Sequence, residues 1–161
     1  MTSSFEAWKS ELIFTGNIVD DSYDPATEAE VYAQSMRYIE LLDAVDGTEG
    51  IDAARAIIQS IQAVEDYGAT RALDRFPPDI FMQALVDELP SLINRRRDWA
   101  GEILCALAGA GGTRWESYIY WFNALLMQAP SSSRKVITDF ISIEEKGGWL
   151  EHNVGVLGGT E

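Results

Sequence analysis

The chain has 161 residues, of which 47% are hydrophobic and 11% aromatic, as expected for one globular domain and not for a disordered protein. It carries 26 Asp and Glu residues against 12 Lys and Arg residues, a formal net charge of −14 at pH 7. Nucleic acids and anionic membranes are therefore disfavoured as partners, because both are polyanions. The acidic composition favours a basic protein partner. The alternative is that the acids only keep the surface well solvated and bind no partner.

Three features predict a cytoplasmic protein without a membrane-spanning segment. No apolar run approaches the roughly 20 residues that a helix needs to cross a bilayer. The first residues, MTSSFEAWK, have neither the basic region nor the apolar run of a signal peptide. The single cysteine, Cys105, cannot form an internal disulfide, so the fold does not require an oxidising compartment.

The first part of the chain predicts three helices. A short amphipathic helix is expected over residues 4–14, and a longer one over about 26–45 with either Asp24 or Thr27 as its N-cap. A Gly-rich break separates it from a third helix over about 50–66. Because the break is only about five residues long, the second and third helices should form an antiparallel pair. The inward stripe of the second helix comprises Val31, Ser35, Tyr38, Leu42 and Val45.

The middle of the chain predicts a helical hairpin. A short connecting helix over 69–76 ends at Pro77, and the hairpin follows over 78–112. Its polar turn, residues 94–98, ends in Asp98 as the N-cap of the second helix. The residues expected to point inward are Phe81, Leu85, Leu89 and Leu92 in the first helix and Trp99, Ile103, Ala106, Leu107 and Ala110 in the second.

The last part of the chain predicts two further helices and a Gly-rich tail. Residues 113–116, Thr-Arg-Trp-Glu, form a capping box for a helix that is apolar on most of its circumference, as in helices packed between neighbours. A final helix is expected over 133–145. The tail, residues 146–161, is rich in glycine, with a short extended piece expected at 154–156.

These elements predict an all-α fold in which antiparallel helix pairs stack as an irregular HEAT-like or armadillo-like bundle. The pairs begin near residues 26, 78 and 113. Because the spacing is uneven and no consensus repeats, an irregular helical bundle without repeats is the alternative. One domain is expected over residues 1–161, with the Gly-rich tail at its end.

The chain offers little of the chemistry that enzymes use. His152 is the only histidine, and Cys105 shares a helix face with apolar residues, so a Cys–His catalytic pair is not expected. There is no HExxH, CxxC or GxGxxG motif, and one His with one Cys cannot make a conventional zinc site. A metal site made only of carboxylates is conceivable at Asp20, Asp21 and Asp24. The spacing of these residues matches no EF-hand loop. We therefore expect no enzymatic activity, no cofactor and no resident metal.

Three consecutive arginines, Arg95, Arg96 and Arg97, interrupt an otherwise acidic chain. They could bind phosphate groups. Alternatively, they could offset the macrodipole at the C-terminal end of the first hairpin helix. Their position favours this structural interpretation.

The negative charge is concentrated in the first part of the chain. Residues 1–66 contain 14 Asp and Glu against three Lys and Arg, a net charge of −11, whereas residues 67–161 have a net charge of −3. An acidic field accelerates association with basic proteins, and tyrosines beside carboxylates are typical of interfaces; a solvated face is the alternative. The candidate partner-binding residues are Asp20, Asp21, Tyr23, Asp24, Glu28, Asp43, Asp46, Glu49, Asp52, Glu65, Asp66 and Tyr67.

The hairpin over 78–112, the helix that starts with Thr-Arg-Trp-Glu-Ser-Tyr-Ile at 113–119, and the acidic region 20–66 together resemble a known family. A small, acidic, all-helical chain of this kind resembles the bacterial immunity proteins that neutralise toxins of contact-dependent and type VI delivery systems. The resemblance implies a protein that binds a cognate toxin domain, for example a nuclease. Its acidic surface would occlude a basic active-site or substrate cleft of the toxin. One alternative is a HEAT-like adaptor that binds another protein and has no toxin partner. The other is an enzyme, which would need a deep pocket with convergent polar groups, lined for example by Trp115, Tyr118, Trp121 and Glu116.

Overall fold

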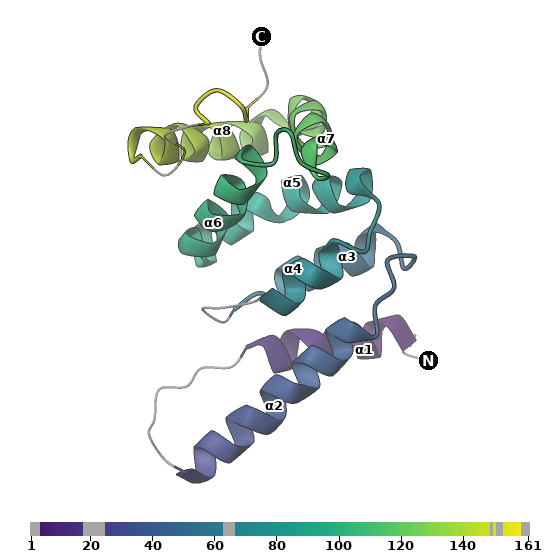
Figure 1. Cartoon of the computed structure of the whole chain (residues 1–161). Helices are drawn as coiled ribbons and strands as arrows, with labels where there is room; N and C mark the ends of the chain where they lie inside the picture. The colour runs from purple at the N-terminus through teal and green to yellow at the C-terminus, as the bar shows by residue number, and fades with distance from the viewer. Residues whose placement is uncertain (1–3, 18–24, 63–66, 149, 151–152, 159–161) are drawn as a thin grey trace. The chain divides into compact units, whose positions relative to one another are not determined.

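The computed structural model describes residues 4–17, 25–62, 67–148, 150 and 153–158. These residues form α-helices and no β-strand (Figure 1), which confirms the predicted all-α class. None of the helices is long and apolar enough to cross a lipid bilayer. They are α1 (Ser4–Gly16), α2 (Pro25–Asp43), α3 (Ile51–Gln59), α4 (Tyr67–Leu73), α5 (Pro78–Arg95), α6 (Arg97–Ala108), α7 (Glu116–Gln128) and α8 (Ser131–Lys146).

The helices divide between two packed units. Helices α1 to α4 belong to an N-terminal unit, residues 1–77, and α5 to α8 belong to a C-terminal unit, residues 78–161. The boundary falls between Pro77 and Pro78, where the fixed φ and missing N–H of proline stop a helix from continuing. Pro78 is also well suited to the first position of α5. The expectation of one domain over 1–161 stays a prediction.

In the N-terminal unit, α1 and α4 each pack on both α2 and α3. The end of α1 comes very close to the end of α3, because a Cβ on Gly16 would lie 2.3 Å from the carbonyl oxygen of Ser60. Beside this contact, the hydroxyls of Tyr38 and Ser60 share a buried hydrogen bond of 2.8 Å. The predicted antiparallel pairing of α2 with α3 is wrong, since the close neighbours of α2 are α1 and α4. The short loop limits the distance between the helix ends but does not decide which faces pack.

In the C-terminal unit, α5 is the central helix, and α6, α7 and α8 all pack against it (Figure 1). All four side chains that were predicted to point inward from α5 are buried. Burying each of them stabilises the unit by about 1.5–3 kcal/mol. Of the residues predicted to point inward from the second hairpin helix, Trp99, Leu107 and Ala110 are buried, whereas Ile103 is half-buried and Ala106 is exposed. Leu104, which was not predicted to point inward, is buried.

Only one of the three predicted helix pairs, α5 with α6, is found among the described residues as a pair of close neighbours. Helix α7 packs mainly on α5. The HEAT-like stacking of successive pairs is therefore not confirmed.

Part of the C-terminal tail packs against α7. Residues 153–158 lie in turns and bends, so the extended piece that was predicted within them is wrong. The side chain of Asn123 holds this segment through two bonds: Nδ2 donates to the carbonyl of Val156 at 2.9 Å, and Oδ1 accepts from the amide of Gly158 at 3.1 Å. Leu157 is buried at the same place. The glycines of this segment, Gly155 and Gly158, lie in turns and bends and have positive φ, so its glycine-rich composition reflects tight turns.

Candidate protein-binding surface

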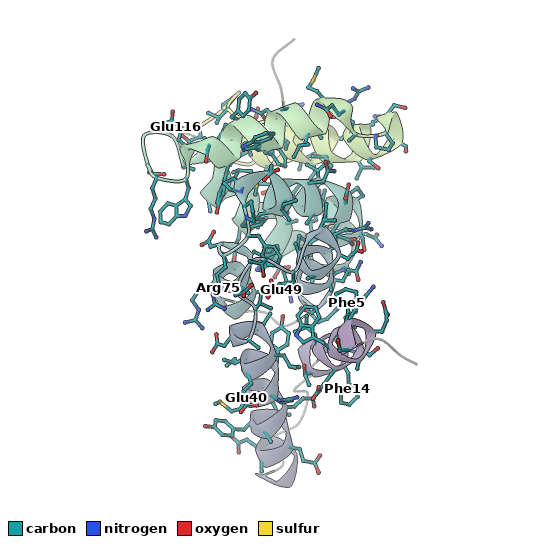
Figure 2. All side chains as sticks on the ribbon, turned by 90° about the vertical axis from the view of Figure 1, so that its right-hand side faces the viewer. Phe5, Phe14, Glu40, Glu49, Arg75 and Glu116 are labelled. Atoms are coloured by element: carbon teal, nitrogen blue, oxygen red, sulfur yellow. The ribbon has the colours of Figure 1, made fainter. Side chains whose placement is uncertain are left out.

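The loop over residues 44–50 joins α2 to α3, and its own carboxylates hold it in shape (Figure 2). Glu49 accepts from the backbone amides of Asp46 at 2.7 Å and Gly47 at 2.9 Å. Asp46 in turn accepts from the amide and the hydroxyl of Thr48, at 2.9 and 2.6 Å. These bonds stabilise the ionised form, and the pKa of Asp46 is lowered, chiefly by the Thr48 hydroxyl. Two of the predicted partner-binding acids therefore act first within the loop itself.

Arg75, just after α4, fixes the loop from the other side. Its Nη1 donates to the carbonyl oxygens of Leu42, Asp43 and Val45 at 3.2, 3.3 and 2.8 Å, which caps the C-terminal end of α2. Its Nη2 lies 3.7 Å from the carboxylate of Asp43. Gly47 is required here, because its φ is 97° and a Cβ would lie 1.9 Å from the carbonyl oxygen of Arg75.

The two remaining described acids of the prediction, Glu28 and Asp52, are exposed. Each lies in the first turn of its helix, α2 or α3, where a negative charge is favourable near the positive end of the macrodipole. Glu28 and Asp43 are separated by about 22 Å along α2, from the rise of 1.5 Å per residue. The predicted acids that the structure describes therefore line an extended surface and do not converge on a small site.

An exposed face of α2 connects these two acids. Glu28, Tyr32, Met36, Ile39 and Asp43 follow one another at helical spacing and form what we call the α2 face. Its three apolar side chains are 68%, 41% and 36% exposed. Sequence reasoning missed them because it assigned only one apolar stripe to this helix, the buried stripe that includes Tyr38. The spacing of the second stripe was the signal that could have found it.

The only basic residue of α2, Arg37, is held by carboxylates on both sides. It bonds Glu11 of α1 at 2.6 and 3.1 Å and Glu40 at 3.2 Å. The hydrogen bond raises the pKa of Arg37 and lowers the pKa of Glu11. Because this cation is neutralised by its neighbours, the α2 face keeps its acidic character.

A small hollow lies next to the loop, between α1 and the start of α3. We call it the aromatic hollow; its volume is about 360 Å³. The rings of Phe5 and Trp8 lie 5.9 Å apart in its wall, and the indole N–H of Trp8 donates to the carbonyl of Leu41 at 3.3 Å. Figure 2 labels Phe5 on α1 and Glu49 on the loop, which both line the hollow. The lining residues are Ser4, Phe5, Trp8, Ala44, Val45, Glu49 and Ala53.

Six of the predicted binding residues lie outside the described residues: Asp20, Asp21, Tyr23, Asp24, Glu65 and Asp66. Tyr67 is the first residue of α4, and the structure does not describe its side chain. Their part in binding stays a prediction.

Two of the three consecutive arginines, Arg96 and Arg97, contact other residues of the C-terminal unit. Arg96 forms a bidentate bond with Asp98, at 3.0 and 2.9 Å, which lowers the pKa of Asp98. The guanidinium of Arg97 lies 4.8 Å from the ring centroid of Phe140, a cation–π contact. Arg95 ends α5. These contacts favour the structural interpretation. Asp98 lies in the first turn of α6 and not at its N-cap, which is Arg96.

The C-terminal unit exposes a second group of apolar side chains on α7: Tyr120, Trp121 and Met127. A hollow of about 650 Å³ beside them is lined by Gly111, Glu116, Ser117, Ile119 and Tyr120. The carboxylate of Glu116 accepts from the amide of Gly112 at 2.5 Å, one residue earlier than a capping box predicts. The N-cap of α7 is Trp115, whose side chain makes no cap hydrogen bond, so the predicted capping box that begins at Thr113 is wrong.

Within the part of the chain that the structure describes, no three His, Cys, Asp or Glu side chains converge to hold a metal ion. No protein-family model, no curated protein and no solved structure matches the chain. The interpretation of the surface therefore depends on its geometry and chemistry alone.

Proposed function

We propose that this chain is an immunity protein that binds a cognate bacterial toxin and neutralises it by covering a basic active-site or substrate cleft. The observation that carries the proposal is the α2 face. On it three exposed apolar side chains, Tyr32, Met36 and Ile39, lie between the carboxylates of Glu28 and Asp43.

The composition of the α2 face is that of a protein interface. Interface centres are enriched in Tyr and Met and depleted in charge, whereas charged residues lie at the rim. An apolar centre supplies affinity, and carboxylates at both ends supply orientation and a faster association with a basic partner. An acidic rim could occupy the place of phosphate groups in the cleft of a nuclease.

The charge of the N-terminal unit supports the same partner. Residues 1–77 carry 15 Asp and Glu against five Lys and Arg, a net charge of −10, whereas residues 78–161 have a net charge of −4. Such a field steers a basic protein towards the unit that bears the α2 face.

A growth-protection assay tests this proposal. The reading frames that flank the gene are expressed singly in a bacterial host, and one that arrests growth is then co-expressed with this protein. We expect protection by the native protein and its loss in the triple variant Tyr32→Ala, Met36→Ala and Ile39→Ala. The variant should still fold, because the three side chains are exposed and alanine has a high helix propensity.

The matched control changes exposed apolar residues of the other unit. The double variant Tyr120→Ala and Met127→Ala removes comparable side chains from α7 and should protect as well as the native protein. The proposed function is wrong if no flanking frame encodes a toxin that this protein relieves. The assignment to the α2 face is wrong if the triple variant and the control protect equally.

The exposed side chains of α7 favour a second candidate, a protein-binding adaptor without a toxin. Tyr120 and Trp121 stack edge to face at 5.4 Å in the less acidic unit, whose net charge is −4, so they suit an apolar partner. An adaptor would have no toxin gene beside its own. Its binding would be lost in the α7 variant and retained in the α2 variant.

A further inference from the structure

The aromatic hollow of the N-terminal unit has a lining that suits one kind of chemical group. Its walls are two aromatic rings, small aliphatic side chains and Ser4, and Glu49 is the one charged residue among those that line it. Its volume of about 360 Å³ is at the lower end of the range for ligand pockets, about 300–1,000 Å³. The hollow is therefore large enough for one long side chain.

Glu49 presents a carboxylate that is already fixed in place. The amides of Asp46 and Gly47 bond one oxygen each, at 2.7 and 2.9 Å. Each carboxylate oxygen has two lone pairs, so each can still accept a second bond from a ligand. The side chain loses little freedom when a cation arrives, because the loop has already ordered it.

The rings of the hollow add a second preference for a cation. The indole of Trp8 is tethered by its bond to the carbonyl of Leu41, and Phe5 lies beside it. Aromatic faces attract a cation that lies within about 6 Å of the ring centroid. A guanidinium suits such a site better than an ammonium, because it stacks on rings and pairs with both oxygens of a carboxylate.

We propose that the aromatic hollow receives an arginine side chain of the basic partner protein. The guanidinium pairs with Glu49, and the methylene stem and planar face lie against Phe5 and Trp8. This assignment rests on the proposed function, from which the basic character of the partner is taken. What it adds is one arginine of the partner that anchors the complex in the hollow. The net charge of −10 on the N-terminal unit is complementary to such a partner.

A titration of the full chain with N-acetyl-L-arginine amide tests the proposal. The signal of the Trp8 indole N–H, assigned with a Trp8→Phe variant, is followed by NMR. We expect a saturable shift with the arginine amide, a weaker response with N-acetyl-L-lysine amide, and none with N-acetyl-L-citrulline amide, which has the same shape without the charge. A citrulline response equal to that of arginine, or a lysine derivative that binds as tightly, would overturn the proposal.

Two variants separate binding from folding. Phe5→Leu leaves the carboxylate bonds of the loop intact and should raise the Kd for the arginine amide about two- to fivefold, the usual worth of an exposed cation–π contact. Glu49→Gln should raise it further, whereas Glu40→Gln, outside the lining, should leave it unchanged. An unchanged Kd in Phe5→Leu contradicts the proposal even if Glu49→Gln loosens the loop.

The arginine titration needs no toxin, so its outcome can be separated from that of the protection assay. Arginine binding without any relieved toxin would overturn the proposed function alone. Protection that persists in Phe5→Leu and Glu49→Gln, together with a flat titration, would overturn the arginine site alone.

Discussion

The carboxylates of the α2–α3 loop bind the loop's own backbone before they can meet any partner. Glu49 satisfies two amides, and Asp46 satisfies the amide and hydroxyl of Thr48. A lysine at these positions would leave the donors without acceptors and place a cation beside Arg75. Loss of function in such a variant would therefore report a broken loop as readily as a lost interface. For this reason the α2 face is the better place to test binding.

Gly47 and Gly50 allow the cost of a close backbone approach to be measured separately from the cost of a positive φ. Both have φ near +90°, where a Cβ costs about 1–3 kcal/mol. At Gly47 the Cβ would also meet the carbonyl of Arg75, whereas at Gly50 nothing lies within 4 Å. We expect Gly47→Ala to lower the free energy of unfolding by clearly more than Gly50→Ala, as measured by urea denaturation. Equal losses would show that the loop can move away from Arg75.

Helix α2 shows what the sequence could predict and what it could not. Helical spacing correctly placed Tyr38 and Leu42 on a common face, and both are buried. The same spacing joins Tyr32 and Met36 on another face, which is exposed. Periodicity identifies residues that share a face, but only the neighbouring helices decide which apolar face they cover. The prediction of the buried stripe is therefore confirmed at Tyr38, Leu42 and Val45, and the prediction of the binding surface missed its apolar half.

The loop and the hairpin show a second limit of the sequence. Acidic composition predicted that Asp46 and Glu49 lie on an exposed loop, but it could not show that backbone amides and Thr48 use their carboxylates. That choice depends on dihedral angles, including the positive φ of Gly47. In α6 the prediction of Ala106 as an inward residue is wrong, because a small alanine side chain says little about which face of a helix is buried.

The C-terminal end of α2 is capped by one side chain, that of Arg75, which follows α4 in the chain. Arg75 donates to the carbonyls of Leu42 and Asp43 at the end of the helix and to that of Val45 just after it. Carbonyls in the last turn lack the amide of a following turn, although that of Leu42 also accepts from the amide of Val45. Arg75→Met keeps the apolar stem and removes every donor, and we expect it to cost about 1–3 kcal/mol of stability. Amide exchange in the last turn of α2 should become faster in this variant.

The control for Arg75→Met is Arg71→Met on α4, whose side chain is exposed. It removes the same charge from the same helical segment without removing the cap. Equal stabilities and equal exchange rates for the two variants would contradict the capping role of Arg75.

At the scale of the whole molecule, charge opposes folding. A net charge of −14 repels itself, most strongly in the N-terminal unit with its net charge of −10. The exposed ion pair between Arg37 and Glu11 counters this repulsion only locally, since water screens the attraction between exposed charges. A basic partner would relieve the repulsion, so binding and stability should be coupled.

Salt tests this balance directly. The Debye length falls from about 30 Å at 0.01 M to about 3 Å at 1 M, so added salt removes long-range repulsion first. We expect the Tm at pH 7 to rise by a few degrees over this range, equally in NaCl and KCl, because screening does not distinguish the two cations. A fall in Tm would mean that ion pairs such as Arg37–Glu11 outweigh the repulsion.

A second pH supplies the control for this salt dependence. At pH 5, closer to the isoelectric point near 4.3, the net charge is smaller, and the rise in Tm with salt should shrink. The lowered pKa values of Asp46 and Asp98 keep both carboxylates ionised at this pH. Such groups add stability above their unfolded pKa of about 3.9 and lose it only as pH falls through their lower folded pKa. Their hydrogen bonds therefore persist at pH 5, and the change in salt response isolates the repulsion among the remaining acids.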